Sequence, residues 1–197
     1  MTASVLEHTL VCRLWQAPFA ERKFAPIVAN NDLTQIRRVL DVGCGPGTNT
    51  HHFTQSDYLG LDVNPRYIDA ARRRTGRRFI VADATTYEVD PSERFDFIFL
   101  NSFLHHVDTP SVRRILSHVA TLLTDDGAIH ILDLVRPARS GVAAALARLD
   151  RGDFPRPLDE WKTLFEESYR SVMFEPYALT GIGVTLWQMI YFKGQRR

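Results

Sequence analysis

Short apolar runs alternate with helix-like segments through the middle of the chain. Apolar runs rich in Val, Ile, Leu and Phe predict buried strands, and apolar positions three and four residues apart predict amphipathic helices. Strands that are apolar on both faces and alternate with helices are typical of a parallel sheet with right-handed crossovers. The predicted strands are 37–42, 58–62, 78–82, 95–100 and 128–134, and the predicted helices are 48–55, 65–76, 111–123, 142–149 and 158–169.

The two ends of the chain have a different pattern. Residues 1–36 approximate a helical stripe, which we expect Pro18 and Pro26 to break. Two later apolar runs, 171–179 and 184–192, are joined by a short glycine-containing turn, which predicts an antiparallel hairpin. We therefore expect a single domain with four parts: an N-terminal helical cap (1–36), a core (37–135), an insertion with a helix (136–169) and a terminal hairpin (170–197).

Composition narrows the class of protein. The 197 residues are 45% hydrophobic and 24% charged, which is ordinary for a globular domain. The formal net charge of +1 gives no overall field that would attract nucleic acid or an anionic membrane. Cys12 and Cys44 form no disulfide framework, and we see neither a signal-peptide pattern nor a run of the roughly 20 apolar residues that span a membrane. We expect a cytoplasmic protein.

A glycine-rich loop follows the first predicted strand. Gly43, Gly45 and Gly47 occupy alternate positions, so the backbone there can approach a ligand without a Cβ atom intervening. Asp62 ends the next strand, where a carboxylate can accept hydrogen bonds from both hydroxyls of a ribose. A dinucleotide-binding loop has its third glycine at the sixth position, which is Thr48 here. The loop therefore indicates a nucleoside-bearing cofactor other than a dinucleotide.

Together with three later segments, this region resembles the class I S-adenosylmethionine-dependent methyltransferases. Asp41 and the three glycines match the first motif of the family, Asp62 matches the acid of its second strand, and Asp83 with Ala84 matches its third motif. Residues 94–106 resemble strand four, and residues 122–133 resemble strand five with its lead-in helix and a turn at Gly127. The resemblance implies an α/β, Rossmann-like three-layer sandwich, with a seven-stranded, mostly parallel sheet in the order 3-2-1-4-5-7-6 and an antiparallel strand 7.

The same resemblance implies S-adenosylmethionine as the cofactor and assigns residues to it. Asp62 would bind the ribose, Asp83 would accept the adenine amine, and Asp41 would order the loop or meet the methionine amino group through water. For Asp62 the alternative is a helix cap, and for Asp83 it is a solvated loop acid. The implied cofactor residues are Asp41, Gly43, Gly45, Gly47, Asp62, Val63, Asp83, Ala84 and Asn101.

Histidines supply the candidate base and the candidate metal ligands. His105 or His106 could accept a proton if the acceptor loses one, or one of them could pack beneath the loop while the other caps the next turn. His51 and His52 are adjacent rather than three or four residues apart, which does not suit shared metal binding on a helix. We therefore expect no metal site.

The acceptor is expected to be a small molecule, apolar or aromatic and carrying an anionic group. Aromatic side chains could form a lid over it or could simply complete the core, and arginines could hold its carboxylate or phosphate. The arginines at 72–74 and 77–78 are explained mainly by a solvent-exposed helix end, so we expect no nucleic-acid partner. The lid residues are Trp15, Phe19, Phe24, Phe154, Leu158 and Trp161, and the arginines for the anion are Arg136, Arg139, Arg151 and Arg156.

Methyl transfer to oxygen, nitrogen or carbon of a small molecule is thus the predicted function, and three alternatives remain. An RNA or protein methyltransferase is disfavoured by the near-neutral charge and by Asn101-Ser-Phe-Leu104, which is unlike an Asn-Pro-Pro-Tyr tetrapeptide. An NAD(P)-dependent oxidoreductase is disfavoured by the glycine spacing and the terminal hairpin. A cofactor-binding protein without catalytic activity would be recognised by binding without turnover.

Overall fold

The computed structural model describes residues 19–138, 143, 146, 153–181 and 183–197. Two units make up the structure, one ending at Asn31 and the other beginning at Asp32. The expected single domain stays a prediction. The helical stripe before residue 19 and nearly all of the predicted helix 142–149 lie outside the described residues.

Helix α2 (Ala20–Asn30) belongs to the first unit and continues through Pro26. The expected break at Pro26 is therefore wrong. A proline in a helix lacks one N–H donor, and here side-chain amides strengthen the turn that follows. Asn30 Nδ2 donates to the carbonyl of Pro26 and Asn31 Nδ2 donates to that of Ile27, each at 2.8 Å.

A seven-stranded sheet organises the second unit, and its order β3-β2-β1-β4-β5-β7-β6 confirms the predicted topology. Strands β1 to β5 pair in parallel, and β7 is antiparallel to both of its neighbours. The predicted hairpin is confirmed as β6 and β7. The strands are β1 (Arg38–Val42), β2 (Asp57–Asp62), β3 (Arg78–Val81), β4 (Phe95–Asn101), β5 (Leu123–Leu134), β6 (Tyr169–Gly181) and β7 (Val184–Arg196).

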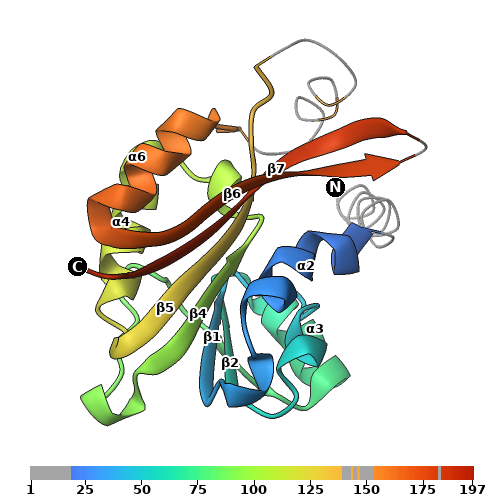
Figure 1. Cartoon of the computed structure of the whole chain (residues 1–197). Coiled ribbons are helices and arrows are strands. Elements are labelled where there is room, and N and C mark those ends of the chain that lie inside the picture. Colours follow the sequence, from blue (N-terminus) through green and yellow to red (C-terminus); the bar gives the residue numbers. More distant parts are fainter. Residues whose placement is uncertain (1–18, 139–142, 144–145, 147–152, 182) are drawn as a thin grey trace. The chain divides into compact units, whose positions relative to one another are not determined.

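Helices cover both faces of this sheet. Helices α4 (Thr109–Ala120) and α6 (Leu158–Ser168) lie together on one face, and α3 (Pro65–Thr75) lies on the other (Figure 1). The ends of α3 follow its sequence: the Asn64 side chain accepts from the N–H of Arg66, and Gly76 ends the helix in the left-handed conformation, with φ 66°. The single-turn 3₁₀ helices are η2 (Leu33–Gln35), η3 (Thr50–Phe53), η4 (Pro91–Glu93) and η5 (Leu104–His106).

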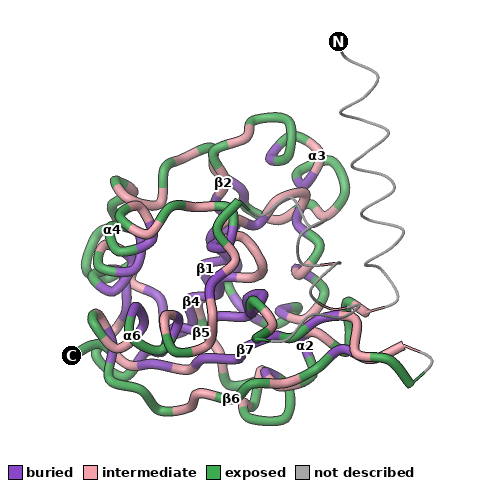
Figure 2. The backbone as a smooth tube through the Cα atoms, turned by 90° about the horizontal axis from the view of Figure 1, so that it is seen from above, coloured by how far each residue is buried: buried purple, intermediate pink, exposed green. Residues whose placement is uncertain are grey.

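The core lies between these layers, and buried stretches follow the central strands (Figure 2). Under α4 and α6 the sheet is mainly aliphatic, and Phe165 stacks on both Trp161 and Phe192. The α3 side is aromatic where Tyr58 meets Phe79 edge to face. Because apolar burial of this extent is the main driving force for folding, the two layers fix the position of the strand ends.

Two predicted elements differ from the structure. Residues 48–55 form turns and the 3₁₀ helix η3 instead of an α-helix. Threonine, asparagine and histidine, which dominate this segment, have low helix propensity. The predicted turn at Gly127 lies instead within β5, which begins at Leu123, but the pairing of β5 with β4 shifts register here, between Phe95 and Phe97 of β4. A Cβ atom there would lie 2.9 Å from the Phe95 carbonyl oxygen, so glycine permits close pairing of β4 and β5.

The β6–β7 hairpin extends beyond the carboxyl end of β5. Strand β7 pairs with β5 only from Met189 onward, opposite Leu134, whereas its first residues pair only with β6. The hairpin therefore projects on the side of the sheet where the parallel strands end (Figure 1). Among the described residues, no helix has the length and apolar character needed to cross a bilayer.

Candidate active site

The glycine loop is held against the end of β2. The N–H groups of Gly43 and Cys44 both donate to the carbonyl of Leu61, at 2.7 and 3.1 Å. Gly45 has a φ of +52°, and a Cβ atom built on it would meet no protein atom within 4 Å. The loop therefore needs glycine for its conformation and leaves open space beside Gly45, where a ligand can approach the backbone.

Asp62 joins the second strand to this loop. Its Oδ2 accepts from the N–H of Gly45 at 2.9 Å, and its Oδ1 accepts from the N–H of Asn64 at 2.8 Å. Each carboxylate oxygen has a second lone pair, so both can still accept a hydrogen bond from a ligand hydroxyl. The structure brings Asp62 beside the loop as expected. The ribose role remains a prediction, as does a role for its exposed neighbour Val63.

Asp41 is fully buried at the carboxyl end of β1. Its Oδ2 accepts from Tyr58 Oη at 2.6 Å and from Asn49 Nδ2 at 3.2 Å, whereas its Oδ1 has no hydrogen-bond partner. Burial raises the pKa of Asp41 to about 7, against the lowering effect of the bonds from Tyr58 and Asn49, and the nearby Asp62 raises it further. An unpartnered buried acceptor is costly, so the residues fit a ligand that brings a cationic donor, such as the amino group of S-adenosylmethionine.

Asn101 is connected to Asp41 through Asn49, a residue that the sequence analysis did not single out. Its Nδ2 donates to Asn49 Oδ1 at 3.3 Å, and Asn49 in turn donates to Asp41. Phe103 was also missed: a Cβ atom on Gly43 would lie 2.7 Å from its ring, so the ring lies against the glycine loop. Neither contact has a sequence signal, because each joins segments far apart in the chain.

Asp83 lies in the turn after β3 and is exposed. Its Oδ1 accepts from both the N–H and the hydroxyl of Thr85, each at 2.8 Å. These bonds lower the pKa of Asp83, so the carboxylate is ionised at neutral pH. The carbonyl of Asp62 accepts from the N–H of Ala82 at 3.1 Å, so the turn starts beside the ribose candidate. The adenine role of Asp83 and Ala84 remains a prediction.

The two predicted histidines have different environments. His105 Nδ1 lies 2.5 Å from Asp133 Oδ1, and both side chains are almost completely buried. Asp133, next to the last residue of β5, also accepts from the N–H groups of Leu104 and Leu134, at 3.0 and 2.7 Å. His106 is exposed. The structure thus separates the doublet into one oriented, buried imidazole and one at the surface.

Arg156 holds the η5 loop and is not available for an acceptor anion. Its guanidinium is buried and donates to the carbonyls of Leu104 and Val107, at 3.0 and 2.6 Å. It also lies 4.9 Å from the centroid of the Trp161 ring. The expected anion-holding role of Arg156 is therefore wrong. Arg136 is exposed, and Arg139 and Arg151 lie outside the described residues.

The aromatic residues expected to form a lid include one that is buried in the core and one that is exposed. Trp161 is fully buried and its Nε1 donates to the carbonyl of Leu134 at 3.0 Å, so it belongs to the core. Phe154 is 42% exposed, and its N–H donates to the carbonyl of His105 at 3.0 Å. Trp15 lies outside the described residues. Phe154 is thus the lid candidate that lies beside His105.

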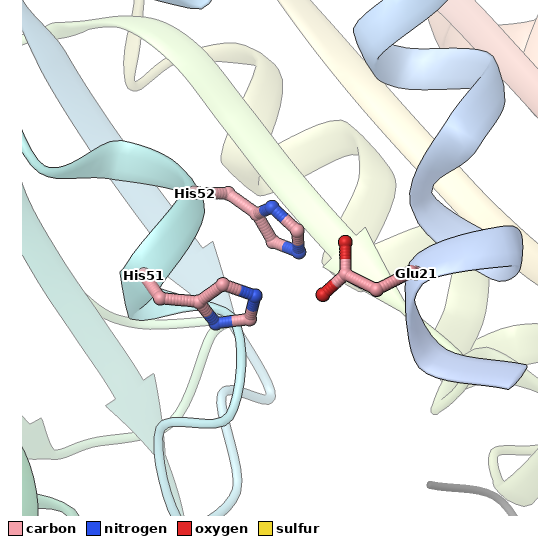
Figure 3. A group of neighbouring side chains, drawn as sticks. All are labelled: Glu21, His51 and His52. Atoms are coloured by element: carbon pink, nitrogen blue, oxygen red, sulfur yellow. The ribbon is translucent and has the colours of Figure 1, made fainter. Parts of the chain in front are cut away.

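His51 and His52 lie closer together than expected for adjacent helical residues. Their ring centroids are 3.8 Å apart, on the 3₁₀ turn η3 (Figure 3). The argument that adjacent histidines point apart therefore fails, because the segment is not an α-helix. The expectation of no metal site stays a prediction.

Residues 39–127 match the family model described as a methyltransferase domain. With the sheet order and the glycine loop, this match supports the assignment of these residues to a methyltransferase domain of the S-adenosylmethionine-dependent type.

Relatives and solved structures agree with this assignment. The chain is 31% identical over 115 residues to trans-aconitate 2-methyltransferase of Methylobacterium radiotolerans, covering 56% of this chain and 43% of that one. It is 29% identical over 130 residues to ubiquinone biosynthesis O-methyltransferase of Rhodopseudomonas palustris, covering 63% and 51%. The chain thus spans about half the length of these curated relatives. The N-methyltransferase NodS of Bradyrhizobium japonicum, solved with S-adenosyl-L-homocysteine, shares the fold at a TM-score of 0.68 and 17% identity, covering 90% and 88%.

Proposed function

We propose that this protein transfers a methyl group from S-adenosylmethionine to a hydroxyl group of a small molecule. Support for the cofactor comes from the family match and from the unpartnered Oδ1 of Asp41 beside a glycine loop that is open at Gly45. Asp41 would receive the amino group, Asp62 the ribose, and Asp83 with Ala84 the adenine. When bound, the cofactor supplies a methyl group on a positively charged sulfur, so the protein need not create the electrophile.

A hydroxyl acceptor is favoured by the buried pair of His105 and Asp133. In the proposed arrangement Asp133 accepts from the Nδ1–H of His105, and the imidazole would then carry its lone pair on Nε2. A neutral imidazole oriented in this way accepts the proton that a hydroxyl loses as it is methylated. His105 is therefore the proposed base, and Asp133 is its positioning residue.

The acceptor is proposed to be apolar or aromatic. The N–H of Phe154 donates a hydrogen bond to the carbonyl of His105, and its ring offers an aromatic surface beside the proposed base. Arg136 remains as the described arginine for an acceptor anion. The relatives named for trans-aconitate and for ubiquinone biosynthesis support a small molecule rather than RNA or protein. A cytoplasmic location stays part of the prediction.

Calorimetric titration tests the cofactor. We expect S-adenosylmethionine to bind and NADH not to bind. Asp62→Asn should weaken S-adenosylmethionine binding at least tenfold, because charge-assisted hydrogen bonds contribute about 1.5–3 kcal/mol. The exposed acid Asp126, changed to Asn, is the matched control. Tight NADH binding, or an unchanged affinity in a folded Asp62→Asn variant, would count against the proposed cofactor.

Turnover with phenols, aliphatic alcohols and carboxylates tests the reaction. His105→Gln should lower kcat roughly 10²- to 10⁴-fold on a hydroxyl acceptor without changing cofactor affinity, since base catalysis contributes about that much. The neighbouring change His106→Gln should lower kcat less than twofold. Turnover of carboxylates alone would exclude the base role, because an ionised acceptor has no proton to lose. Cofactor binding without turnover on any acceptor would indicate a non-catalytic binding protein.

A further inference from the structure

An open groove lies beside the glycine loop, between η3 and the end of α3. Its volume is about 490 Å³, and it belongs entirely to the unit that begins at Asp32. Arg74, Arg77 and His51 line it together with four threonines, and none of the described lining residues is acidic. None of them is among the predicted cofactor residues, so the groove is a separate feature of the surface.

Arg77 provides a fixed positive charge in this groove. Its Nη1 donates to the carbonyl of Ser56 at 3.0 Å, and its Nη2 donates to the carbonyls of Phe53 and Thr54, each at 2.9 Å. These partners are neutral, and no carboxylate in the described part of the chain pairs with Arg77. The guanidinium is therefore held in one place while its charge is not neutralised.

A second arginine and an imidazole also line the groove. Arg74 comes from the last turn of α3, and the His51 ring extends from η3, where its Nδ1 lies 3.0 Å from the carbonyl oxygen of Thr48 (Figure 3). Arginines suit phosphate because the planar guanidinium offers several N–H donors to its oxygens. The charge of the groove thus favours an anionic group with more than one oxygen.

Hydroxyl groups line the rest of the groove, at Thr48, Thr50, Thr54 and Thr75. A hydroxyl both donates and accepts, so these side chains suit a ligand that also carries hydroxyl groups. The volume falls within the roughly 300–1,000 Å³ of small-molecule sites, which is more than a bare phosphate ion needs. The ligand is therefore expected to have a body attached to its anionic group.

We propose that the groove binds a small phosphorylated molecule with a hydroxylated body, at a site distinct from that of the cofactor and the acceptor. The phosphate would lie against Arg74 and Arg77, and the hydroxylated body would contact the threonines. Binding does not depend on methyl transfer, so it can be measured on the protein without cofactor.

Titration at constant ionic strength tests the site, with inorganic phosphate, glucose 6-phosphate and glucose as probes. Both phosphates should bind in a saturable manner, glucose 6-phosphate more tightly, and glucose should not bind. Arg74→Gln should weaken both phosphates about tenfold, as expected for loss of one charged hydrogen bond. Arg73→Gln, on the exposed neighbouring position of α3 and outside the groove, should change neither.

A second variant tests the hydroxylated body without altering charge. Thr54→Val keeps the side-chain shape and should weaken glucose 6-phosphate severalfold while leaving inorganic phosphate unchanged. Equal losses in Arg73→Gln and Arg74→Gln, or no saturable binding of either phosphate, would overturn the proposal. Tighter binding of a single-stranded RNA 12-mer, equally sensitive to both arginine changes, would overturn it in favour of a basic surface for nucleic acid.

Discussion

Asp41 and Asp133 are buried carboxylates at the ends of two parallel strands, yet their surroundings are opposite. Asp41 accepts from two neutral side chains on one oxygen, and its other oxygen has no partner. Asp133 accepts on both oxygens, from two backbone N–H groups and from His105. Since a buried charge without full pairing is costly, the difference separates a carboxylate that suits an incoming cation from one that already holds its own partner.

The largest expected effect is on the free energy of unfolding, because Asp41 is buried and one of its oxygens has no hydrogen-bond partner. Its pKa of about 7 in the folded protein lies above the ordinary value of 3.8, so folding takes up a proton between these values. The contribution of Asp41 to stability is therefore present below about pH 4 and is lost as the pH rises through 7. The full effect is of the order of 4 kcal/mol.

Urea unfolding between pH 4.5 and 8, without cofactor, measures this effect. The Asp41→Asn variant cannot titrate at this position, so it should exceed the wild type in unfolding free energy by a few kcal/mol at pH 8. The two proteins should converge toward pH 4.5. Parallel stability profiles across the range would show that Asp41 is better paired than its contacts indicate.

The same substitution at Asp133 should have the opposite sign. In Asp133→Asn an amide NH₂ replaces one acceptor oxygen and faces a donor, either the N–H of Leu104 or the N–H groups of His105 and Leu134. Breaking a buried pair in this way should lower the unfolding free energy by about 3 kcal/mol. Asp126→Asn, an exposed acid in the same strand, controls for the general effect of removing a charge. A loss below 1 kcal/mol would remove the contrast between the two sites.

Cofactor affinity gives a third measure of the comparison. Asp41→Asn should weaken S-adenosylmethionine binding roughly 10- to 100-fold at pH 8, because a buried charged hydrogen bond contributes about 1.5–3 kcal/mol. Wild-type affinity should fall as the pH drops below 7, where Asp41 is protonated, and should approach that of the variant. Calorimetry at several pH values would detect this, and a pH-independent wild-type affinity would contradict it.

Local sequence signals were enough to predict the sheet and the loop. Apolar runs and alternate glycines each act over a few residues, whereas the order of the strands was implied by the family resemblance and is confirmed by the structure. The helix expected at 48–55 does not form, because the threonine, asparagine and histidine residues of this segment have low helix propensity. That error also led to the wrong geometry for His51 and His52.

The contacts that complete the site could not be predicted in this way. Asn49 meets Asn101 across 52 positions, and the pair of His105 and Asp133 is separated by 28. Arg156 was expected to bind an anion because a guanidinium suits a carboxylate or a phosphate, but its N–H groups donate to backbone carbonyls of Leu104 and Val107. Tertiary packing, which no local pattern encodes, decides which oxygen is left without a partner.

The smallest expected effect concerns His130, a buried histidine whose pKa is lowered by burial, whereas burial raises the pKa of Asp41. His130 stacks on Phe97 and lies 3.0 Å from Tyr191 Oη, and burial together with Lys193 holds the pKa of its imidazole well below the ordinary value. The unfolded chain therefore binds a proton here that the folded protein does not, so stability is lost as the pH falls through 6.5.

In an Asp41→Asn background, which removes the opposing carboxylate effect, the unfolding free energy should fall by about 1 kcal/mol between pH 6.5 and 5.5. Adding His130→Gln, which keeps a polar partner for Tyr191 but does not titrate, should remove most of this fall. An equal fall with and without His130 would assign the acid sensitivity to another group.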